Sequence, residues 1–417
     1  MALKIVYPIC CGIDVHKSFV VACIASTNCN DVTTYQKRRF STFTSGLRLL
    51  SSWLSDNNCR DVCMESTGKY WIPIFNILEQ TCKVVLAHPK YVKAIRGKKT
   101  DARDAAWIAD IFKHDLVCGS FIPPPDIRQL RDLTRYSVKL TSFTTGEKNR
   151  AQNCLTVSNI KLDDVFSDVF GKSASAITEQ LLLNPTGNFD VAPYIHHRCK
   201  TPSDKIQEAI NGFICSEQVQ KLKIIRSHMD SLQVCKDSLL STISSLAEKF
   251  RPQIDLLKTV PGILENSAIA IISEIGVDMS VFPTAKNLCS WAGLVPQNNE
   301  SAGKKKTTRI TRAGAYIKPL LVQCALAVCK SDKHPEIKNR YLMLKKRRGH
   351  KKAIIAICRM LLTAIYSMLK KSEAYNPALY RKVDFIPSDR SLSVQQAVAF
   401  VARHGYIVVD PDGVLAS

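Results

Sequence analysis

Three successive β-type segments open the chain, and this order constrains the fold more than any other feature. Residues 10–18 (CCGIDVHKS) and 19–26 (FVVACIAS) predict two strands joined by a short turn, and residues 32–42 (VTTYQKRRFST) predict a third. Helices and strands then alternate, with helices at 45–58, 69–80 and much of 90–115, and strands at 61–67 and 82–89. Three antiparallel strands followed by this alternation predict an α/β fold with a mixed sheet.

The rest of the chain is predicted to be mostly helical. The run IPPPDI at 122–127 interrupts regular structure, and helical periodicity continues to about residue 250, with a weaker stretch at 184–203 that predicts a loop or a helix–helix connection. Long helices between two domains are typical of a coiled-coil arm that serves oligomer contacts. We expect an α/β domain, a helical arm, a mainly helical C-terminal domain and a tail, at residues 1–125, 126–250, 251–371 and 372–417.

The C-terminal domain begins with a predicted helix, turn and second helix at residues 256–276, with Pro261 and Gly262 in the turn. This pattern resembles the helix-hairpin-helix element of sequence-independent DNA-binding proteins. The backbone N–H groups of the turn and of the second helix could receive a phosphate. A plain helical hairpin accounts for the same pattern equally well.

Positive charge is concentrated in one part of the chain. Lys and Arg number 58 against 36 Asp and Glu, a net charge of +22. The segment from Gly303 to Lys352 holds 16 of the cations and only two acids, which gives +14 of this total. A basic helix surface that serves solubility is the alternative, but solubility alone does not require such concentration. The composition therefore predicts a polyanionic partner, and nucleic acid is the commonest one.

Other features indicate a cytoplasmic protein without a membrane partner. The 16 cysteines form no zinc-binding pattern, and many lie in apolar runs, which is typical of reduced, buried thiols. The N-terminus lacks a signal-peptide layout because Asp14, His16 and Lys17 interrupt its apolar stretch. No apolar run is expected to reach the roughly 18–20 residues that cross a bilayer.

Four acidic residues are placed where a divalent metal site could form. Asp14 lies near the end of the first predicted strand and Glu65 at the end of the fourth, while Asp101 and Asp104 are spaced to share one face of a helix. Mg²⁺ prefers a few carboxylates together with water and phosphate oxygens, and one or two such ions can act on a phosphodiester. Taken singly, each acid is more often a turn, cap or surface residue. Their order resembles that of the ribonuclease H-like superfamily.

Five separated motifs make the resemblance more specific. They are GIDVHKS, MESTGKYW, HPKYVKAIRGKKTDARDA, TVPGI and SWAGLVPQNNESAGKKKTTRITRAGAYIKPLLVQCA. Together they resemble the DEDD transposases of bacterial insertion sequences, the IS110 family, over about residues 10–370. The resemblance implies a RuvC-like N-terminal domain whose four catalytic acids correspond to Asp14, Glu65, Asp101 and Asp104. It also implies a coiled coil, a serine-bearing C-terminal domain, DNA as substrate and a bridge RNA as guide.

The serine of this family corresponds to Ser301 in ESAGKKK, although Ala302 stands where the family often has Gly. The resemblance implies that its hydroxyl attacks a DNA phosphodiester and forms a covalent phosphoserine, within a site shared between subunits of a tetramer. A serine hydroxyl is a weak nucleophile that needs activation. The following cations could hold and polarise the phosphate: Lys304, Lys305, Lys306, Arg309 and Arg312. The alternative is that Ser301 caps a turn while these cations bind phosphate.

A second basic run, KKRRGHKK at 345–352, is predicted to contact nucleic-acid phosphates through Lys345, Lys346, Arg347 and Arg348. Aromatic residues are sparse there, so base stacking is not expected. No segment is typical of a sequence-reading helix, which agrees with site selection by a guide RNA.

Three functions remain open from the sequence. The first is an RNA-guided recombinase that uses Mg²⁺ and Ser301. The second is a RuvC-type nuclease that hydrolyses DNA junctions with the four acids alone, and the third is a nucleic-acid-binding protein without catalytic activity. The role of Ser301 separates the first two, and the roles of Asp14 and Glu65 separate both from the third.

Overall fold

The computed structural model describes residues 3–66, 68–88, 101–296, 299–301, 304–307 and 309–379, together with residues 398 and 401. The chain divides into two compact units, Met1–Pro124 and Pro125–Ser417. Most of the predicted C-terminal tail, and the part of the predicted helix before residue 101, lie outside the described residues.

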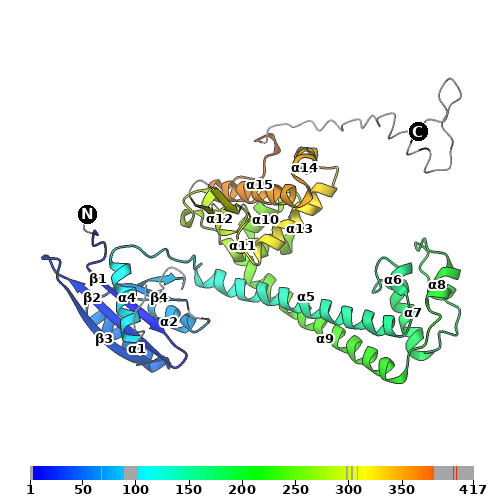
Figure 1. Cartoon of the computed structure of the whole chain (residues 1–417), viewed down its shortest axis with the longest axis horizontal. Coiled ribbons are helices and arrows are strands. Elements are labelled where there is room, and N and C mark those ends of the chain that lie inside the picture. Colours follow the sequence, from blue (N-terminus) through cyan, green and yellow to red (C-terminus); the bar gives the residue numbers. More distant parts are fainter. Residues whose placement is uncertain are drawn as a thin grey trace. The chain divides into compact units, whose positions relative to one another are not determined.

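A five-stranded mixed sheet forms the centre of the first unit (Figure 1). Its strands have the order β3-β2-β1-β4-β5. The first three are antiparallel neighbours, whereas β4 and β5 run parallel to β1. This confirms the predicted mixed sheet and its strands, which are β1 (Ile9–Val15), β2 (Phe19–Thr27), β3 (Thr33–Ser41), β4 (Asp61–Glu65) and β5 (Lys83–Ala87).

Helices cover both faces of this sheet (Figure 1). The helices α1 (Thr44–Asp56) and α2 (Trp71–Leu78) pack against one face, in a core that includes Cys11 and Ile13 of β1. The helix α4 (Asp101–Lys113) packs against the other face, in a core that includes Cys10. Successive side chains of a strand point to opposite faces, so Asp14 shares the face of Cys10 and Gly12, which is the face under α4.

Gly12 allows α4 to approach β1 at backbone distance. A Cβ atom at this position would lie 2.3 Å from the carbonyl oxygen of Ala105 and 2.3 Å from the amide nitrogen of Ala109. The helix presents small side chains at both places, and Ala105 and Ala109 are fully buried. Glycine in a strand interior often marks such a close approach. The first turn of α4, with Asp101 and Asp104, thereby lies over the carboxyl end of β1.

Buried cysteines line the sheet as small apolar residues. Cys10 and Cys63 lie in the core beneath α4, and burial raises the pKa of each thiol to about 12. The thiols therefore stay protonated and unreactive at neutral pH.

Two long helices begin the second unit and lie side by side (Figure 1). They are α5 (Pro125–Val157) and α9 (Ser216–Ala247). The chain between them forms a small helical module, whose core around Ile177, Leu181 and Ile206 also includes residues of α5 and α9. Its elements are α6 (Leu162–Val165), α7 (Lys172–Leu183), η1 (Ala192–Tyr194) and α8 (Ser203–Ala209). The predicted connection at 184–203 is thus a loop with one short 3-10 helix.

The C-terminal part of this unit is a helical bundle with a short β-hairpin. Its helices are α10 (Arg251–Lys258), α11 (Glu265–Ile275), α12 (Ala285–Trp291), α13 (Ile317–Lys330), α14 (Pro335–Arg348) and α15 (His350–Lys371), with 3-10 turns η2 (Glu248–Phe250), η3 (Met279–Val281) and η4 (Pro377–Leu379). The hairpin pairs β6 (Asn299–Ser301) with β7 (Lys304–Thr307).

By length and composition alone, α15 is apolar enough to cross a membrane, contrary to the expectation that no segment would be. Half of its most apolar stretch is buried inside the protein, and Ile357, Leu361 and Ile365 are fully buried. The helix packs against α12, α13 and α14, so its hydrophobicity is explained by its place in the bundle core.

A buried ionic network joins α5 to α11. The Glu274 carboxylate is almost fully buried and accepts hydrogen bonds from Arg135 Nε at 2.6 Å and Arg135 Nη2 at 2.8 Å. Arg131 donates to the backbone carbonyls of Ser273 and Glu274, and the Arg135 guanidinium also lies over the ring of Tyr316. This paired geometry compensates for the desolvation of Glu274 and fixes the bundle on the arm.

The contact at Gly12 generates a stability prediction. Gly12→Ala places a methyl group against backbone atoms of α4, so the helix must move, and we expect the free energy of unfolding to fall by about 1–3 kcal/mol. Scanning calorimetry on the full chain would measure the shift. The control is Gly146→Ala in α5, where the new methyl group meets only the flexible Arg150 side chain at 3.3 Å. Equal stability of the two variants would contradict the proposed constraint.

Candidate active site

Two strand ends and one helix start carry the predicted acids. Residues Ile13 and Met64 are register partners in the parallel pair β1–β4, so Asp14 and Glu65 follow at the carboxyl ends of neighbouring strands. Asp101 and Asp104 lie in the first turn of α4, on the sheet face that Asp14 shares. Carboxylates from β1, β4 and α4 thus lie near the carboxyl ends of β1 and β4.

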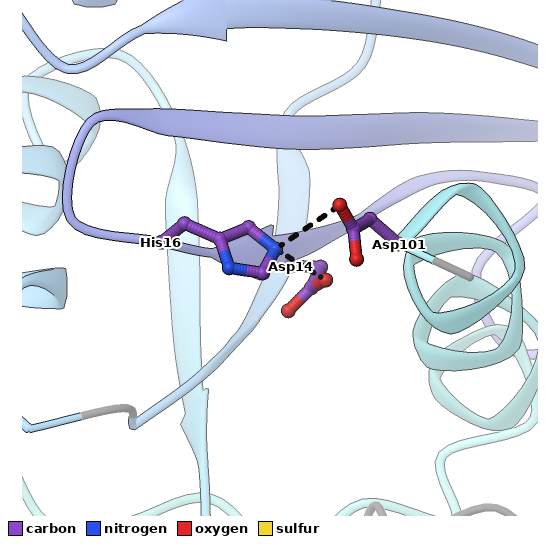
Figure 2. Close-up of side chains that lie close together, drawn as sticks. All are labelled: Asp14, His16 and Asp101. Atoms are coloured by element: carbon purple, nitrogen blue, oxygen red, sulfur yellow. Dashed lines mark hydrogen bonds and ion pairs between the residues drawn. The ribbon is translucent and has the colours of Figure 1, made fainter. Parts of the chain in front are cut away.

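His16 contacts two of these carboxylates through one ring nitrogen (Figure 2). Its Nε2 atom is 3.1 Å from Oδ2 of Asp14 and 3.6 Å from Oδ2 of Asp101. One ligand atom from each of Asp14, His16 and Asp101 lies within 4.8 Å of the others. Two carboxylates and an imidazole at this spacing form a potential cation site.

Burial is the main cause of a raised pKa at Asp14. The charge and the hydrogen bond of His16 lower this pKa, whereas the charges of Asp101 and Asp104 raise it. The ionised Asp14 is therefore short of compensating positive charge, and a bound divalent cation would provide it.

The other two acids take different positions. Asp104 is half-buried and acts on Asp14 through its charge, but it does not belong to the group within 4.8 Å. Glu65 is also half-buried, at the end of β4, and lies outside that group as well. The structure thus brings Asp14 and Asp101 together and leaves Glu65 and Asp104 nearby on the elements that carry them.

His16 was not among the site residues predicted from the sequence. The spacing of Asp14 and His16 could have indicated its role, because residues two apart on a strand share a face. The turn between β1 and β2 fixes the residue further, since His16 N–H donates to the carbonyl of Phe19 at 3.0 Å and the two tilted rings are in contact, with centroids 4.4 Å apart.

Ser301 ends strand β6, where its backbone pairs with that of Lys304 at the start of β7. The strand β7 carries Lys304, Lys305 and Lys306, so the predicted nucleophile and the predicted phosphate-binding lysines occupy one hairpin. Ala302 lies outside the described residues, and only the backbone of the hairpin strands is described. The catalytic role of Ser301 stays a prediction.

The remaining predicted nucleic-acid residues are exposed cations and the turn at Pro261 and Gly262, of which Pro261 is buried and Gly262 is exposed. Arg309 and Arg312 are exposed, as is the last turn of α14 with Lys345, Lys346, Arg347 and Arg348. Cations at a helix C-terminus also stabilise the helix dipole, so this placement has a structural benefit of its own.

The turn between α10 and α11 is packed into the bundle. Pro261 is buried, and Gly262 has φ +81° with its missing Cβ directed at the carbonyl of Cys324. Glu265 occupies the first turn of α11 and pairs with Lys258 at 2.9 Å. These contacts give the turn a packing role, and its binding to phosphate stays a prediction.

Comparison with known proteins identifies the family of this chain. Residues 11–160 match the family model of DEDD transposases of the IS110 type, described as "Transposase", and residues 254–342 match the model described as "Transposase IS116/IS110/IS902 family". The two matched segments together cover more than half of the chain and occur in this order.

Several curated relatives extend over most of the chain. A pilin gene-inverting protein of Moraxella bovis is 22% identical and covers 88% of this chain and 98% of its own length. A probable family 20 transposase of Pseudomonas aeruginosa is 26% identical and covers 76% of this chain and 86% of its own. An insertion element IS110 protein of Streptomyces coelicolor, 43.6 kDa and uncharacterized, is 22% identical and covers 73% and 80%.

The first matched segment contains the sheet and the helix that carry the four acids, and the second contains the hairpin that carries Ser301. The chain belongs to the IS110 family of DEDD transposases, and it is an enzyme that recombines DNA.

Proposed function

We propose that this transposase breaks and rejoins DNA strands with Mg²⁺ held by Asp14, Glu65, Asp101 and Asp104 and with Ser301 as a covalent nucleophile. The observation that supports the metal site most directly is the group of Asp14, His16 and Asp101 within 4.8 Å, at a carboxylate whose pKa burial raises. Use of a divalent metal is also implied by membership of a DEDD family.

The donor set fits a hard cation. Carboxylate oxygens are the ligands that Mg²⁺ prefers, and Asp14 and Asp101 offer them within one small volume. His16 is better suited to orienting Asp14, because its Nε2–H donates to the ionised carboxylate. When bound, Mg²⁺ would polarise a phosphodiester and stabilise the charge that develops on its oxygens.

In the proposed reaction the Ser301 hydroxyl attacks the phosphorus of a DNA phosphodiester. A bond forms between Oγ and phosphorus, the bond to one sugar oxygen breaks, and that sugar leaves with a free hydroxyl group. The serine proton passes to a base or to solvent. A hydroxyl from another strand then displaces Ser301 and restores a phosphodiester. The lysines of β7 would stabilise the negative charge during both steps.

The fold supports a ribonuclease H-like assignment of the first unit, which we include in the proposal. Three antiparallel strands precede two parallel ones, and the acids lie at the ends of β1 and β4 and at the start of a later helix. This is the order that the resemblance to RuvC-like domains implies.

We further propose that a bridge RNA selects the DNA sites and that the active form is a tetramer, a dimer of dimers assembled through the arm. The exposed cations of α14 support phosphate binding, and α5 and α9 offer a long surface for association. The relatives named as gene-inverting proteins support a reaction that rejoins strands over simple hydrolysis.

A covalent-trap assay tests the nucleophile. Labelled element-end DNA, the flanking transcript and Mg²⁺ are incubated with the full chain and separated on a denaturing gel. We expect a protein–DNA adduct in the wild type and a loss of at least about 1,000-fold in Ser301→Ala and Asp14→Ala. Ser290→Ala in α12 is the matched serine control and should retain the adduct. Cut DNA without adduct, unaffected by Ser301→Ala, would instead identify a RuvC-type hydrolytic nuclease.

A stability measurement tests the metal site independently of DNA. Because the pKa of Asp14 is raised in the folded state, the stability of the fold falls as pH rises from the ordinary pKa of an aspartate to the raised one, and the full destabilisation is present above it. Without divalent cations, Asp14→Asn should therefore raise Tm by a few degrees at neutral pH, and the difference should vanish in acid. Added Mg²⁺ should raise the Tm of the wild type but not of the variant.

The control for this measurement is Asp110→Asn on the same helix. Asp110 pairs with Lys113 at 2.9 Å and accepts a hydrogen bond from Tyr35 at 2.5 Å, so its replacement should lower Tm and preserve the response to Mg²⁺. An equal response to Mg²⁺ in the wild type and in Asp14→Asn would place the metal elsewhere.

A further inference from the structure

A stack of side chains leads from the acid cluster to the edge strand of the sheet. His16, which contacts Asp14, lies against Phe19 with ring centroids 4.4 Å apart and ring planes tilted by 32°. The Arg39 guanidinium also lies over the ring of Phe19, with its central carbon 3.6 Å from the ring centroid. A continuous series of contacts therefore joins the Asp14 carboxylate to the Arg39 guanidinium through the rings of His16 and Phe19.

The strand register places Arg39 on the same face as the acids. Val21 is the register partner of Asp14 on β1 and of Arg39 on β3, so the three residues form one row across the sheet. Residues directly opposite in antiparallel strands share a face. With neighbouring strands about 4.8 Å apart, the backbones at Asp14 and Arg39 are about 10 Å apart.

Arg39 is oriented and available for an anion. It is exposed on β3, and among the residues that the structure describes no carboxylate pairs with it. A guanidinium that stacks on a ring keeps its N–H groups in the plane of the group, where they can hydrogen-bond a phosphate. The stack also reduces the side-chain entropy that Arg39 would lose on binding.

We propose that Arg39, held by Phe19, binds a backbone phosphate of the DNA strand whose scissile phosphodiester lies at the acid cluster. The backbones at Asp14 and Arg39 are separated by two strand spacings, about 10 Å, so Arg39 can reach a phosphate of the same strand close to the scissile one. Arg39 is thus a positioning residue, and it fixes which phosphodiester reaches Asp14. This inference rests on the proposed function of the acid cluster.

The neighbouring Arg38 provides a matched control. It carries the same charge on the same strand, but the alternation along β3 directs it to the opposite face, where its guanidinium lies 5.2 Å from the Phe40 ring centroid. Phe40 belongs to the core beneath α1 and α2, away from the acids. Removing Arg38 therefore changes net charge equally without touching the proposed phosphate site.

The experiment measures DNA binding by the full chain as a function of salt concentration, with EDTA present so that no strand is cut. For Arg39→Ala we expect a three- to tenfold rise in Kd for element-end DNA and a salt slope smaller by about one. Arg38→Ala should change Kd less than twofold and leave the slope unchanged. Arg39→Lys should recover the slope but only part of the affinity, because lysine retains the charge and loses the planar stack.

Two further arms separate the sources of phosphate and the two proposals. The same titration with single-stranded RNA should show no effect of Arg39→Ala, and a loss confined to RNA would overturn the assignment to DNA. At saturating DNA with Mg²⁺, Arg39→Ala should shift the position of cleavage while retaining the covalent adduct. Equal Kd and slope in Arg39→Ala and Arg38→Ala would refute this inference alone, whereas cleavage that survives Asp14→Ala would refute the proposed function itself.

Discussion

The backbone contact between Gly12 and α4 is the constraint on which the acidic site depends. Any side chain at this position would meet Ala105 and Ala109 at 2.3 Å, so the strand and the helix reach this distance only because one has no Cβ and the other carries methyl groups. The contact lies one helical turn from Asp101 and two residues from Asp14. The close packing of α4 on β1 therefore determines how far apart the Asp14 and Asp101 carboxylates lie.

Bringing carboxylates together carries an electrostatic cost that the surrounding residues offset only in part. His16 lowers the pKa of Asp14, but burial and the charges of Asp101 and Asp104 raise it. This cost indicates a functional role for the cluster, because clustered acids with perturbed pKa values are typical of functional sites. The same His16 ring contacts Phe19, and Arg39 lies over Phe19, so these side chains connect the acidic site to a cation on the edge strand β3.

The sequence predicted the elements well and their contacts less well. The strands, their mixed order and the strand-end acids followed from local pattern, since alternation and turn residues are local properties. His16 and Arg39 were missed as site residues because their roles arise from a tight turn and from cross-strand register, which depend on pairing. The apolar character of α15 was missed because its lysines and its arginine interrupt the apolar run, whereas its buried stripe is defined by packing. The close approach of Gly262 to the Cys324 carbonyl likewise depends on α13, which is distant in sequence.

The most direct test of this account is anomalous diffraction from crystals of the full chain soaked in Mn²⁺, which replaces Mg²⁺ at oxygen-rich sites. The account predicts a peak within about 2.0–2.6 Å of carboxylate oxygens of both Asp14 and Asp101, and no such peak in Asp14→Asn. A strong peak bound elsewhere, with these two carboxylates free of metal, would contradict the claim that the Gly12 contact assembles the metal site.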